Sequence, residues 1–234
     1  MGEYLQLEAS SASEILAWAA ATFGHGFAIA TSFQKEGMAI VDMASRVGAP
    51  VRAFTLDTGR LPEETHRMIE TVRERYGIAV EVVFPDSGDV ERMVSQRGPN
   101  LFYESLESRR LCCEVRKVRP FERKLRELSA WATGLRRQQS ETRAEVAKVE
   151  SVDGRVRICP LADWSGDQVD RYIAENAVPV HPLYGRGYAS IGCAPCTRPV
   201  EPGESERAGR WWWEQDARKE CGIHFAADGL VRRA

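Results

Sequence analysis

Short apolar runs alternate with amphipathic segments in the first part of the chain, and this alternation constrains the fold more than any other feature. Residues 26–32, 51–59 and 79–85 have the length and composition of buried strands. Residues 36–47 and 62–76 carry apolar side chains at helical spacing, and the second of these segments opens with a proline and acidic residues. Strand–helix–strand units of this kind predict right-handed crossovers and a parallel sheet with helices on both faces, an α/β fold.

The segments that follow the first two strands are polar. They read "TSFQKEG" (31–37) and "LDTGRLPEE" (56–64). Ligands of open α/β sheets bind at the carboxyl ends of the strands. We therefore expect both segments to face one crevice.

The pattern is looser after residue 85. Residues 105–128 predict a long helix with a kink before Pro120, and residues 131–143 predict a strand that runs into a loop. Further along, Ser165 is placed to act as the N-cap of another helix.

A hairpin turn and an irregular C-terminal part complete the chain. Asp153 and Gly154 are a residue pair typical of tight hairpin turns. From residue 178 onward, proline and glycine are frequent and periodic segments are few. We expect one α/β domain over residues 1–205 and a C-terminal tail over residues 206–234, with the irregular part lying over the sheet.

Composition and charge exclude some classes of partner. The chain is 28% charged with a net charge of −2, so its bulk charge predicts neither a nucleic-acid nor a membrane partner. Its first ten residues lack the cationic and apolar regions of a secretory signal. No apolar run approaches the roughly 18 residues that a membrane span needs. We expect a cytoplasmic protein whose thiols stay reduced.

Six cysteines need an explanation, because paired cysteines in a cytosolic chain indicate metal or redox chemistry first. Cys112 and Cys113 are adjacent, and Cys193 and Cys196 form a C-x-x-C pair. Two close pairs rarely arise from packing alone, so we expect them to hold a metal centre. Cys159 stands apart and is expected to be a small buried hydrophobic residue.

The adjacent pair bears on the identity of the metal. Neighbouring residues of a helix point about 100° apart, whereas a single zinc ion draws its sulfur ligands to one point at about 2.3 Å. A four-iron cluster offers each thiolate its own iron. The pair therefore favours a [4Fe–4S] cluster, with zinc as the alternative. Eight Arg or Lys residues and four Glu lie between Glu104 and Arg126, and part of this charge would neutralise a cluster or bind an anionic substrate.

The C-terminal region carries a candidate nucleophile and a candidate anion-binding pair. Cys221 follows an arginine and a lysine closely and precedes His224 by three residues. Neighbouring positive charge lowers the pKa of a thiol and raises the fraction present as the nucleophilic thiolate. Arg207 and Arg210 share a face if their segment is helical, and such a pair suits a phosphate or a sulfate.

Taken together, these motifs resemble one enzyme family. The two cysteine pairs, with "LDTGRLPEET", "TGLRRQQSETR", "GCAPCTRPV" and "GRWWWEQDARKECG", are similar to motifs of the assimilatory adenylyl-sulfate reductases, within the adenylyl- and phosphoadenylyl-sulfate reductase family. The resemblance extends from about residue 27 to residue 225. It implies an adenine-nucleotide α-hydrolase-like fold, related to that of the ATP pyrophosphatases.

The resemblance also implies an activity and a set of site residues. Family members reduce adenosine 5′-phosphosulfate (APS) to sulfite and AMP, with thioredoxin as the electron source. By resemblance, Cys221 is the nucleophile, His224 accompanies it, and the two cysteine pairs hold a [4Fe–4S] cluster. The residues implied to bind the nucleotide are Ser32, Leu56, Asp57, Gly59 and Gly134. Those implied to bind the phosphosulfate are Lys117, Arg137, Arg143, Arg207 and Arg210.

Several alternatives stay open. A phosphoadenylyl-sulfate (PAPS) reductase is the nearest rival, although by resemblance those enzymes lack the two cysteine pairs. An iron–sulfur tRNA thiolase of the same fold would need a glycine-rich pyrophosphatase loop, where this chain has Ser32 to Glu36. Within that segment Gln34 replaces the glycine usual in the family, which leaves the loop's contacts open. A non-catalytic rival is a four-cysteine zinc module that binds a partner. An oligomer of identical chains is an alternative to a monomer.

Overall fold

A computed structural model describes residues 4–48, 50–140 and 143–214 of the chain. Its residues divide into two compact units, each built from segments that are distant in sequence. The first unit comprises Met1–Thr55, Thr65–Glu81 and Leu125–His181. The second unit comprises Leu56–Glu64, Val82–Lys124 and Pro182–Ala234. The predicted division at residue 205 stays a prediction.

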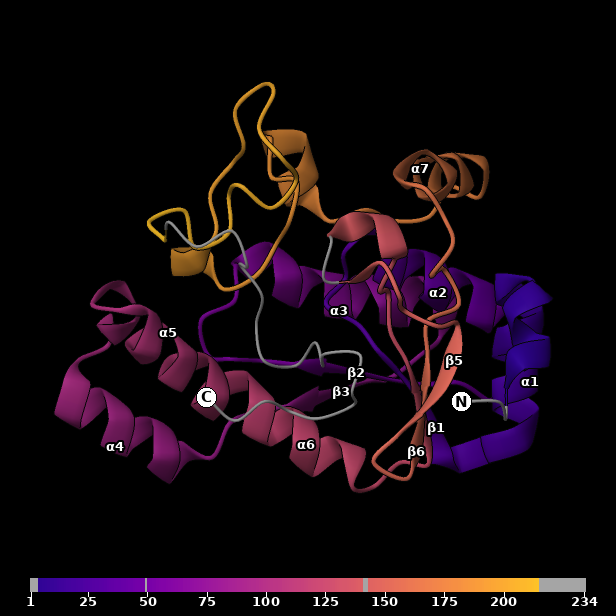
Figure 1. Ribbon diagram of the computed structural model, residues 1–234, viewed down its shortest axis with the longest axis horizontal. Helices are drawn as coiled ribbons and strands as arrows, with labels where there is room; N and C mark the ends of the chain where they lie inside the picture. The colour runs from indigo at the N-terminus through magenta and orange to yellow at the C-terminus, as the bar shows by residue number, and fades with distance from the viewer. Residues whose placement is uncertain (1–3, 49, 141–142, 215–234) are drawn as a thin grey trace. The chain divides into compact units, whose positions relative to one another are not determined.

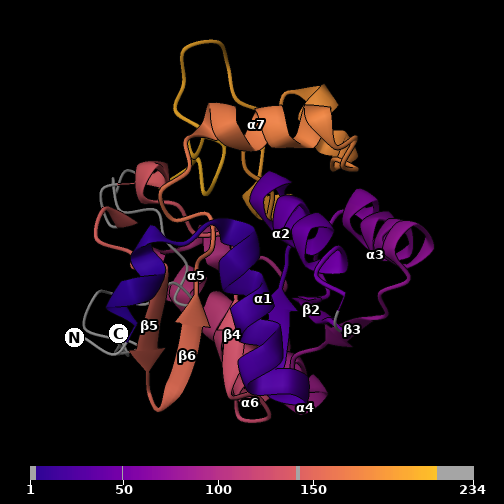
Figure 2. The same ribbon diagram turned by 90° about the vertical axis from the view of Figure 1, so that its right-hand side faces the viewer.

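A six-stranded sheet has the strand order β3-β2-β1-β4-β6-β5. The strands are β1 (Phe27–Ala30), β2 (Arg52–Leu56), β3 (Val80–Val83), β4 (Ala130–Ala132), β5 (Val149–Val152) and β6 (Arg155–Ile158). β1 runs parallel to β2 and to β4, and β4 runs parallel to β6. Figure 2 shows β5, β6 and β4 side by side, and β5 is antiparallel to β6. The predicted α/β class is confirmed, with one antiparallel edge strand added.

Seven α-helices are described. They are α1 (Ala12–Phe23), α2 (Lys35–Ser45), α3 (Glu63–Tyr76), α4 (Ser87–Arg97), α5 (Leu106–Cys113), α6 (Arg119–Leu125) and α7 (Gly166–Glu175). Ser165 caps α7, with Gln168 completing a capping box, as the sequence predicts. Ser11 and Glu14 form another capping box at the start of α1. This helix was not predicted from the sequence. α4 was also missed, although Asp86 caps it.

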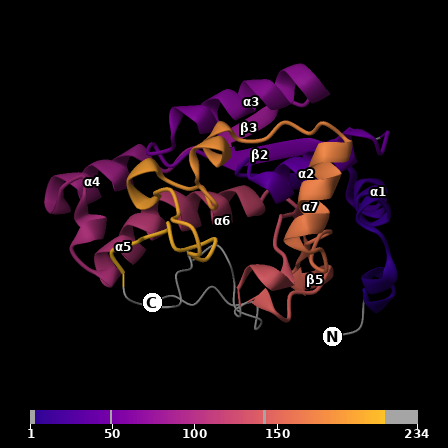
Figure 3. The ribbon, with the colours of Figure 1, turned by 90° about the horizontal axis from the view of Figure 1, so that it is seen from above.

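The long helix expected over 105–128 is confirmed, with a change of winding inside it. α5 passes through a π-helical segment, Glu114–Val118, directly into α6. The wider turn precedes Pro120, which has no N–H to give to the helix ladder. α4 lies beside this composite helix (Figures 1 and 3). Cys113 therefore lies at the end of the regular turns, and Lys117 lies in the π-helical part.

The hairpin expected at Asp153 and Gly154 is also confirmed. Both residues have positive φ, 49° and 74°, the combination that two-residue turns between twisted strands favour. The turn joins β5 to β6, and Val149 pairs with Ile158 at its open end. β5 thereby becomes the antiparallel edge of the sheet.

The core of the first unit lies around α1, α2 and the central strands. Ile29 of β1 and Ile40 of α2 are fully buried, and α2 is buried on almost every side. Burial of such side chains is the main favourable term in folding. α7 lies next to α2 (Figure 3). No helix of the described residues is long and apolar enough to cross a membrane.

A buried carboxylate joins α2 to α7. The Tyr172 hydroxyl donates to Asp42 Oδ2 at 2.7 Å, and Arg46 Nη2 lies 2.9 Å from the same oxygen. Burial, followed by the hydrogen bond to Asp42, raises the pKa of Tyr172, so its proton stays available to the bond. A buried charge is tolerated only when it is paired and hydrogen-bonded.

Replacing Tyr172 with Phe tests this contact. The ring that packs against Trp164 is kept and only the hydroxyl is lost. Because hydrogen bonds to charged groups contribute about 1.5–3 kcal/mol, we expect the free energy of unfolding to fall by that amount. Urea unfolding followed by circular dichroism measures it. Tyr188→Phe is the control, since the Tyr188 hydroxyl makes no hydrogen bond within the described residues; equal effects of the two changes would contradict the prediction.

Candidate functional site

The second unit contains a cavity lined by all four paired cysteines. Its empty space, part of it open to solvent, is about 360 Å³. The lining residues are Arg60, Phe102, Arg109, Cys112, Cys113, Arg116, Lys117, Cys193, Pro195, Cys196 and Trp211. Two cysteine pairs that are 80 residues apart in sequence are thus brought to one place.

Local structure explains how each pair reaches the cavity. Cys112 and Cys113 end α5, whose start is capped by Ser105. Cys193 and Cys196 flank a tight turn in which the Cys196 N–H donates to the Cys193 carbonyl at 2.9 Å. The C-x-x-C spacing is the length of that turn, so both sulfurs can be presented on one side.

The turn after β2 lies against the second cysteine pair. Thr58 Oγ1 lies 3.2 Å from Cys193 Sγ, and the Ala194 N–H donates to the Arg60 carbonyl at 2.8 Å. Asp57 Oδ1 accepts from the Gly59 N–H at 2.8 Å and closes the turn. Asp57 and Gly59, two of the predicted nucleotide-binding residues, therefore flank a threonine that contacts the cysteine cavity.

Positive charge surrounds the thiols. Arg116 Nη1 donates to the Thr58 carbonyl at 2.7 Å, and Lys117 faces the same cavity. Burial raises the pKa of Cys193, but Lys117 and the Thr58 hydrogen bond outweigh it, so the net pKa is lowered. Burial raises the pKa of Cys112, and burial together with Cys193 raises the pKa of Cys196 to about 12.

The arrangement bears on the kind of metal the cavity can hold. Among the described residues, no three His, Cys, Asp or Glu side chains form a group that could hold a metal ion. A tetrahedral zinc site needs such convergence, whereas a four-iron cluster takes one thiolate at each of four separate irons. Four cysteines around one cavity, with cationic side chains beside them, are the donor set that such an anionic cluster uses. The residues that line the cavity therefore fit the donor set of a four-iron cluster.

The three consecutive tryptophans take three different environments. Trp211 is 1% exposed and lines the cysteine cavity, Trp213 packs against Phe102, and Trp212 is 40% exposed. Residues 206–213 form turns instead of a helix, so the condition under which Arg207 and Arg210 would share a helix face is not met.

The two arginines of that segment differ in their surroundings. Arg210 is buried, with its guanidinium 4.7 Å from the Trp211 ring and its Nη1 3.4 Å from the Ser190 hydroxyl. The absence of a side chain at Gly192 makes room for it, because a Cβ there would overlap the guanidinium. Arg207 is only partly buried, and its carbonyl accepts from the Arg210 N–H at 3.0 Å.

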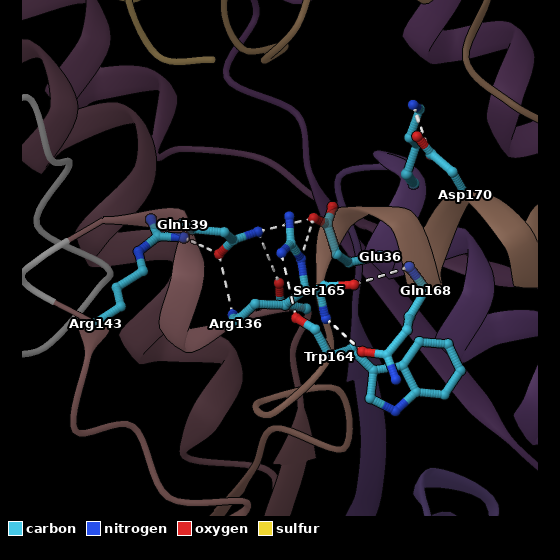
Figure 4. Close-up of polar contacts among 10 residues, drawn as sticks. Glu36, Arg136, Gln139, Arg143, Trp164, Ser165, Gln168 and Asp170 are labelled. Atoms are coloured by element: carbon cyan, nitrogen blue, oxygen red, sulfur yellow. Dashed lines mark hydrogen bonds and ion pairs between the residues drawn. The ribbon is translucent and has the colours of Figure 1, made fainter. Parts of the chain in front are cut away.

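The first unit holds a polar network at the end of β4. Glu36 Oε1 accepts from Arg136 Nε at 2.8 Å and from Gln139 Nε2 at 3.0 Å (Figure 4). Gln139 Oε1 in turn accepts from the Arg136 N–H at 3.1 Å and from the Arg143 guanidinium (Figure 4). The loop after β4 is thereby fixed to the start of α2, close to the predicted residue Gly134.

The predicted residues of this unit do not all join that network. Arg143 does, through Gln139. Arg137 instead donates to the Val146 carbonyl and to Glu8, both at 2.8 Å. Ser32 is exposed after β1, and its hydroxyl accepts from the amide of the unusual Gln34 at 3.1 Å.

The remaining predicted residues are accounted for as follows. Leu56 is the last residue of β2 and belongs to the second unit. Cys159 is fully buried, which confirms the prediction that it is a small buried hydrophobic residue. Burial raises the pKa of Cys159 to about 12. Cys221 and His224 lie outside the described residues. Sequence reasoning missed Arg60, Arg109, Arg116 and Trp211 as cavity residues. The density of positive charge around the first cysteine pair pointed only toward Arg109 and Arg116.

Comparisons with known proteins identify the family of the chain. Residues 26–199 match the model of the phosphoadenosine phosphosulfate reductase domain. An adenosine 5′-phosphosulfate reductase of Burkholderia cepacia is 49% identical over 84% of this chain and 79% of its own length. One from Allochromatium vinosum is 48% identical over 83% of this chain and 77% of its own length. A chloroplastic 5′-adenylylsulfate reductase of Arabidopsis thaliana is 44% identical over 94% of this chain and 50% of its own length.

Solved structures show the same fold. A phosphoadenylyl-sulfate reductase from Candida auris, in a phosphate complex, superposes with a TM-score of 0.69 at 29% identity, covering 83% of this chain and 95% of that one. An FMN adenylyltransferase from Candida glabrata gives 0.57 at 14% identity, over 95% of this chain and 77% of that one. The second likeness concerns the fold alone.

The fold and the site thus define an adenine-nucleotide α-hydrolase-like α/β protein with a four-cysteine cavity. Within that class, the chain belongs to the phosphoadenosine phosphosulfate reductase domain family, in its adenosine 5′-phosphosulfate reductase branch. It is accordingly an oxidoreductase of the kind that acts on sulfur groups.

Gly134→Ala tests the packing at the end of β4. A Cβ at this position would lie 2.7 Å from the Glu36 Cβ and 3.2 Å from the Gly37 backbone N, so the loop or α2 must move. Overpacking of this kind costs about 1–3 kcal/mol, and we expect that loss in the free energy of unfolding. Urea titration measures it. Gly185→Ala is the matched control, because nothing lies within 4 Å of a Cβ there; a Gly134 variant as stable as that control would contradict the packing argument.

Proposed function

We propose that this protein reduces adenosine 5′-phosphosulfate to sulfite and AMP in sulfate assimilation, with thioredoxin as the reductant. The observation that carries the proposal is the cavity lined by both cysteine pairs and by cationic side chains, in a chain of this family. The relatives that match at 44–51% identity carry APS reductase names, which supports APS over PAPS as the substrate.

We further propose that Cys112, Cys113, Cys193 and Cys196 hold a [4Fe–4S] cluster. The support is their shared cavity and the nearby positive charge of Lys117 and the arginines. When bound, the cluster supplies a fixed negative charge and a structural crosslink between the two cysteine pairs. No electron need come from it, because the thiols of the reaction provide two.

Substrate binding is assigned to residues at or near the strand ends and to cationic side chains. For the nucleotide these are Ser32, Leu56, Asp57, Gly59 and Gly134; for the phosphosulfate they are Lys117, Arg137, Arg143, Arg207 and Arg210. The position of the first set after parallel strands supports the assignment, since nucleotides bind at such ends. Guanidinium and ammonium groups suit phosphate and sulfate oxygens.

The chemistry then proceeds in two covalent steps. The Cys221 thiolate attacks the sulfur of the bound sulfate group, the S–O bond to the phosphate breaks, and AMP leaves with the electron pair. This nucleophilic step divides a difficult reduction into two easier ones. Cationic side chains at the phosphosulfate stabilise the charge that develops on the leaving phosphate.

The second step releases the product. A thioredoxin thiolate attacks Sγ of the resulting S-sulfocysteine, and sulfite leaves with the S–S electron pair. The mixed disulfide is resolved by the second thioredoxin thiol, which leaves the Cys221 thiol reduced and thioredoxin oxidised. Residues 206–234 serve as the catalytic tail in this proposal, and His224 accompanies the nucleophile.

The proposal is tested by incubating the purified protein with APS and measuring its mass. We expect an increase of one SO₃ group at Cys221, reversed by reduced thioredoxin with release of sulfite. Cys221→Ser should form no adduct and release no sulfite, and its iron content should equal that of the wild type, because Cys221 is outside the two pairs. Sulfite release at a near wild-type rate by this variant would refute the assignment of the nucleophile.

A second experiment tests the cluster. Replacing any one of Cys112, Cys113, Cys193 and Cys196 with Ser should lose iron and most of the activity, because one iron is left without its thiolate. Cys159→Ser should retain its iron and is the control. Iron and zinc analysis of protein purified without oxygen measures both; a colourless wild type that contains zinc would overturn the cluster and favour a zinc module.

The rival functions give different outcomes. Competition between APS and PAPS in one assay ranks the two substrates, and a higher kcat/KM for PAPS would make the protein a PAPS reductase with the same mechanism. A tRNA thiolase would modify RNA and leave APS unchanged. A cytoplasmic location is proposed from the reduced thiols that the chemistry requires.

A further inference from the structure

A single carboxylate holds both ends of the loop between β4 and β5 (residues 133–148). Glu8 Oε2 accepts from Arg137 Nη2 at 2.8 Å, near the start of the loop. Glu8 Oε1 accepts from the Lys148 N–H at 2.6 Å, at the end of the loop and next to β5. One side chain from the N-terminal part of the chain therefore joins two separate points of this loop.

Glu8 is itself held in place. It belongs to a short 3-10 helix, Leu5–Ala9, in which Leu7 is buried in the core of the first unit. Just after this helix, the Ser10 carbonyl accepts from Lys148 Nζ at 2.9 Å. The carboxylate of Glu8 is thus presented to the loop from an anchored segment.

Inside the loop, further hydrogen bonds connect Glu8 to Arg143. Arg137 Nε donates to the Val146 carbonyl at 2.8 Å, and the Val146 N–H donates to the Arg143 carbonyl at 3.0 Å. Consecutive short contacts between described residues therefore lead from the Glu8 carboxylate to the backbone of Arg143.

The side chain of Arg143 is held by a second carboxylate. Its guanidinium donates to Gln139 Oε1, and Gln139 Nε2 donates to Glu36 Oε1 at 3.0 Å (Figure 4). Glu36 thus acts on the Arg143 side chain, whereas Glu8 acts on the loop backbone that carries it.

The loop lies at the edge of the sheet where ligands bind. It follows the carboxyl end of β4, and at its far end Val149, the first residue of β5, pairs with the last residue of β6. Ligands of open α/β sheets bind at the carboxyl ends of the strands. In the proposed function, Arg137 and Arg143 both bind the phosphosulfate. The contacts of Glu8 therefore bear on two cations assigned to the charged part of the substrate.

Stability is a weak explanation for the ion pair between Glu8 and Arg137. The side chains of Arg137 and Glu8 are 35% and 33% exposed, and ion pairs as open to solvent as this contribute little to stability. The Arg137 guanidinium is planar and is held at both Nε and Nη2, so its orientation is fixed. Orientation of this guanidinium is the main effect expected of the contact.

We propose that Glu8 is a positioning residue for substrate binding, which orients the Arg137 guanidinium and fixes the loop that carries Arg143. The inference rests on the proposed function and gives the N-terminal segment a part in binding the phosphosulfate. Glu8 itself is assigned no contact with the substrate, because a carboxylate repels an anion.

The experiment measures the equilibrium binding of APS by isothermal titration calorimetry. The full-length, iron-containing protein is used in the Cys221→Ser background, so that no adduct forms. For Glu8→Gln we expect the Kd for APS to rise by about threefold to thirtyfold, the range for residues that act on a site without touching the ligand. Glu8→Ala also removes the acceptor of the Lys148 N–H and should raise the Kd further.

The sign of the change separates positioning from simple electrostatics. Glu8 and APS are both negatively charged, so the loss of one negative charge would by itself lower the Kd. Weaker binding by Glu8→Gln is therefore expected only if the carboxylate acts through the cations that it holds. Unchanged or tighter binding by this variant overturns the positioning role.

A double-mutant cycle tests the route through Arg137. In an Arg137→Gln protein the guanidinium that Glu8 holds is already gone, so adding Glu8→Gln should change the Kd by less than about twofold. The glutamine at position 8 still offers an oxygen to the Lys148 N–H, so the cycle isolates the Arg137 contact. Equal weakening by Glu8→Gln with and without Arg137 would show an independent effect and would overturn the proposal.

A matched control is present in the same unit. Glu81 Oε1 lies 2.9 Å from Arg52 Nε and 2.7 Å from Arg52 Nη2, and the Arg52 and Glu81 side chains are 32% and 38% exposed. Arg52 begins β2, at the end of the strand opposite to the ligand-binding edge. Glu81→Gln should change the Kd for APS by less than about twofold. Equal weakening by Glu81→Gln and Glu8→Gln would show a general effect of lost ion pairs.

The outcomes distinguish this inference from the proposed function. Cys221→Ser protein that does not bind APS overturns the proposed function and the inference together. Protein that binds APS equally well with and without the Glu8 carboxylate overturns only the positioning role. Urea unfolding of every variant is followed by circular dichroism, and a Glu8→Gln protein that is unfolded under the binding conditions would assign Glu8 to stability and overturn the positioning role as well.

Discussion

The buried arginines beside the cysteine cavity of the second unit are satisfied by partners from other segments of the chain. Residues 56–64, 82–124 and the described residues from 182 onward supply the lining of one cavity. A guanidinium buried without a partner would cost several kcal/mol. Arg116 is satisfied by the Thr58 carbonyl and Arg109 by Glu214, so each segment supplies a group that another segment needs. The cavity is held in shape by these contacts as well as by apolar packing.

In the first unit, a strained backbone turn and a polar network hold the loops in place. Phe33 adopts a left-handed conformation with φ of 58° although it is not glycine, and it is fully buried. Its N–H donates to Thr31 Oγ1 at 3.0 Å, which helps to hold this strained turn. Strain of this kind persists only where the surroundings determine the conformation, and it is concentrated at functional sites. The Glu36 network then fixes the neighbouring loop after β4 (Figure 4).

The turn after β2 connects the two halves of the proposed chemistry. Asp57 and Gly59 are assigned to the nucleotide, and Thr58 between them contacts Cys193. The turn is closed by its own hydrogen bond, from the Gly59 N–H to Asp57 Oδ1, so these three residues are held close together.

Much of the fold follows from local signals. The strands β1 to β3, the helices α2, α3 and α7 and the hairpin at Asp153 were predicted because periodicity, caps and turn residues act within a few neighbours. α1 and α4 were missed, although each has a capping residue at its start. The cysteine pairs were recognised by their spacing, which is itself a local signal.

Which of two adjacent arginines meets a given partner was not predictable from the sequence. Arg109 is 2% exposed and forms an ion pair with Glu214, whereas its neighbour Arg110 is exposed. Arg136 donates a hydrogen bond to Glu36, whereas its neighbour Arg137 donates one to Glu8. Successive residues point in different directions, so only one of two adjacent arginines can face a given partner. Which one does so depends on segments a hundred or more residues away. The sequence by itself determined the kinds of residue present and the local elements that carry them, and the tertiary structure decided which of those residues meet.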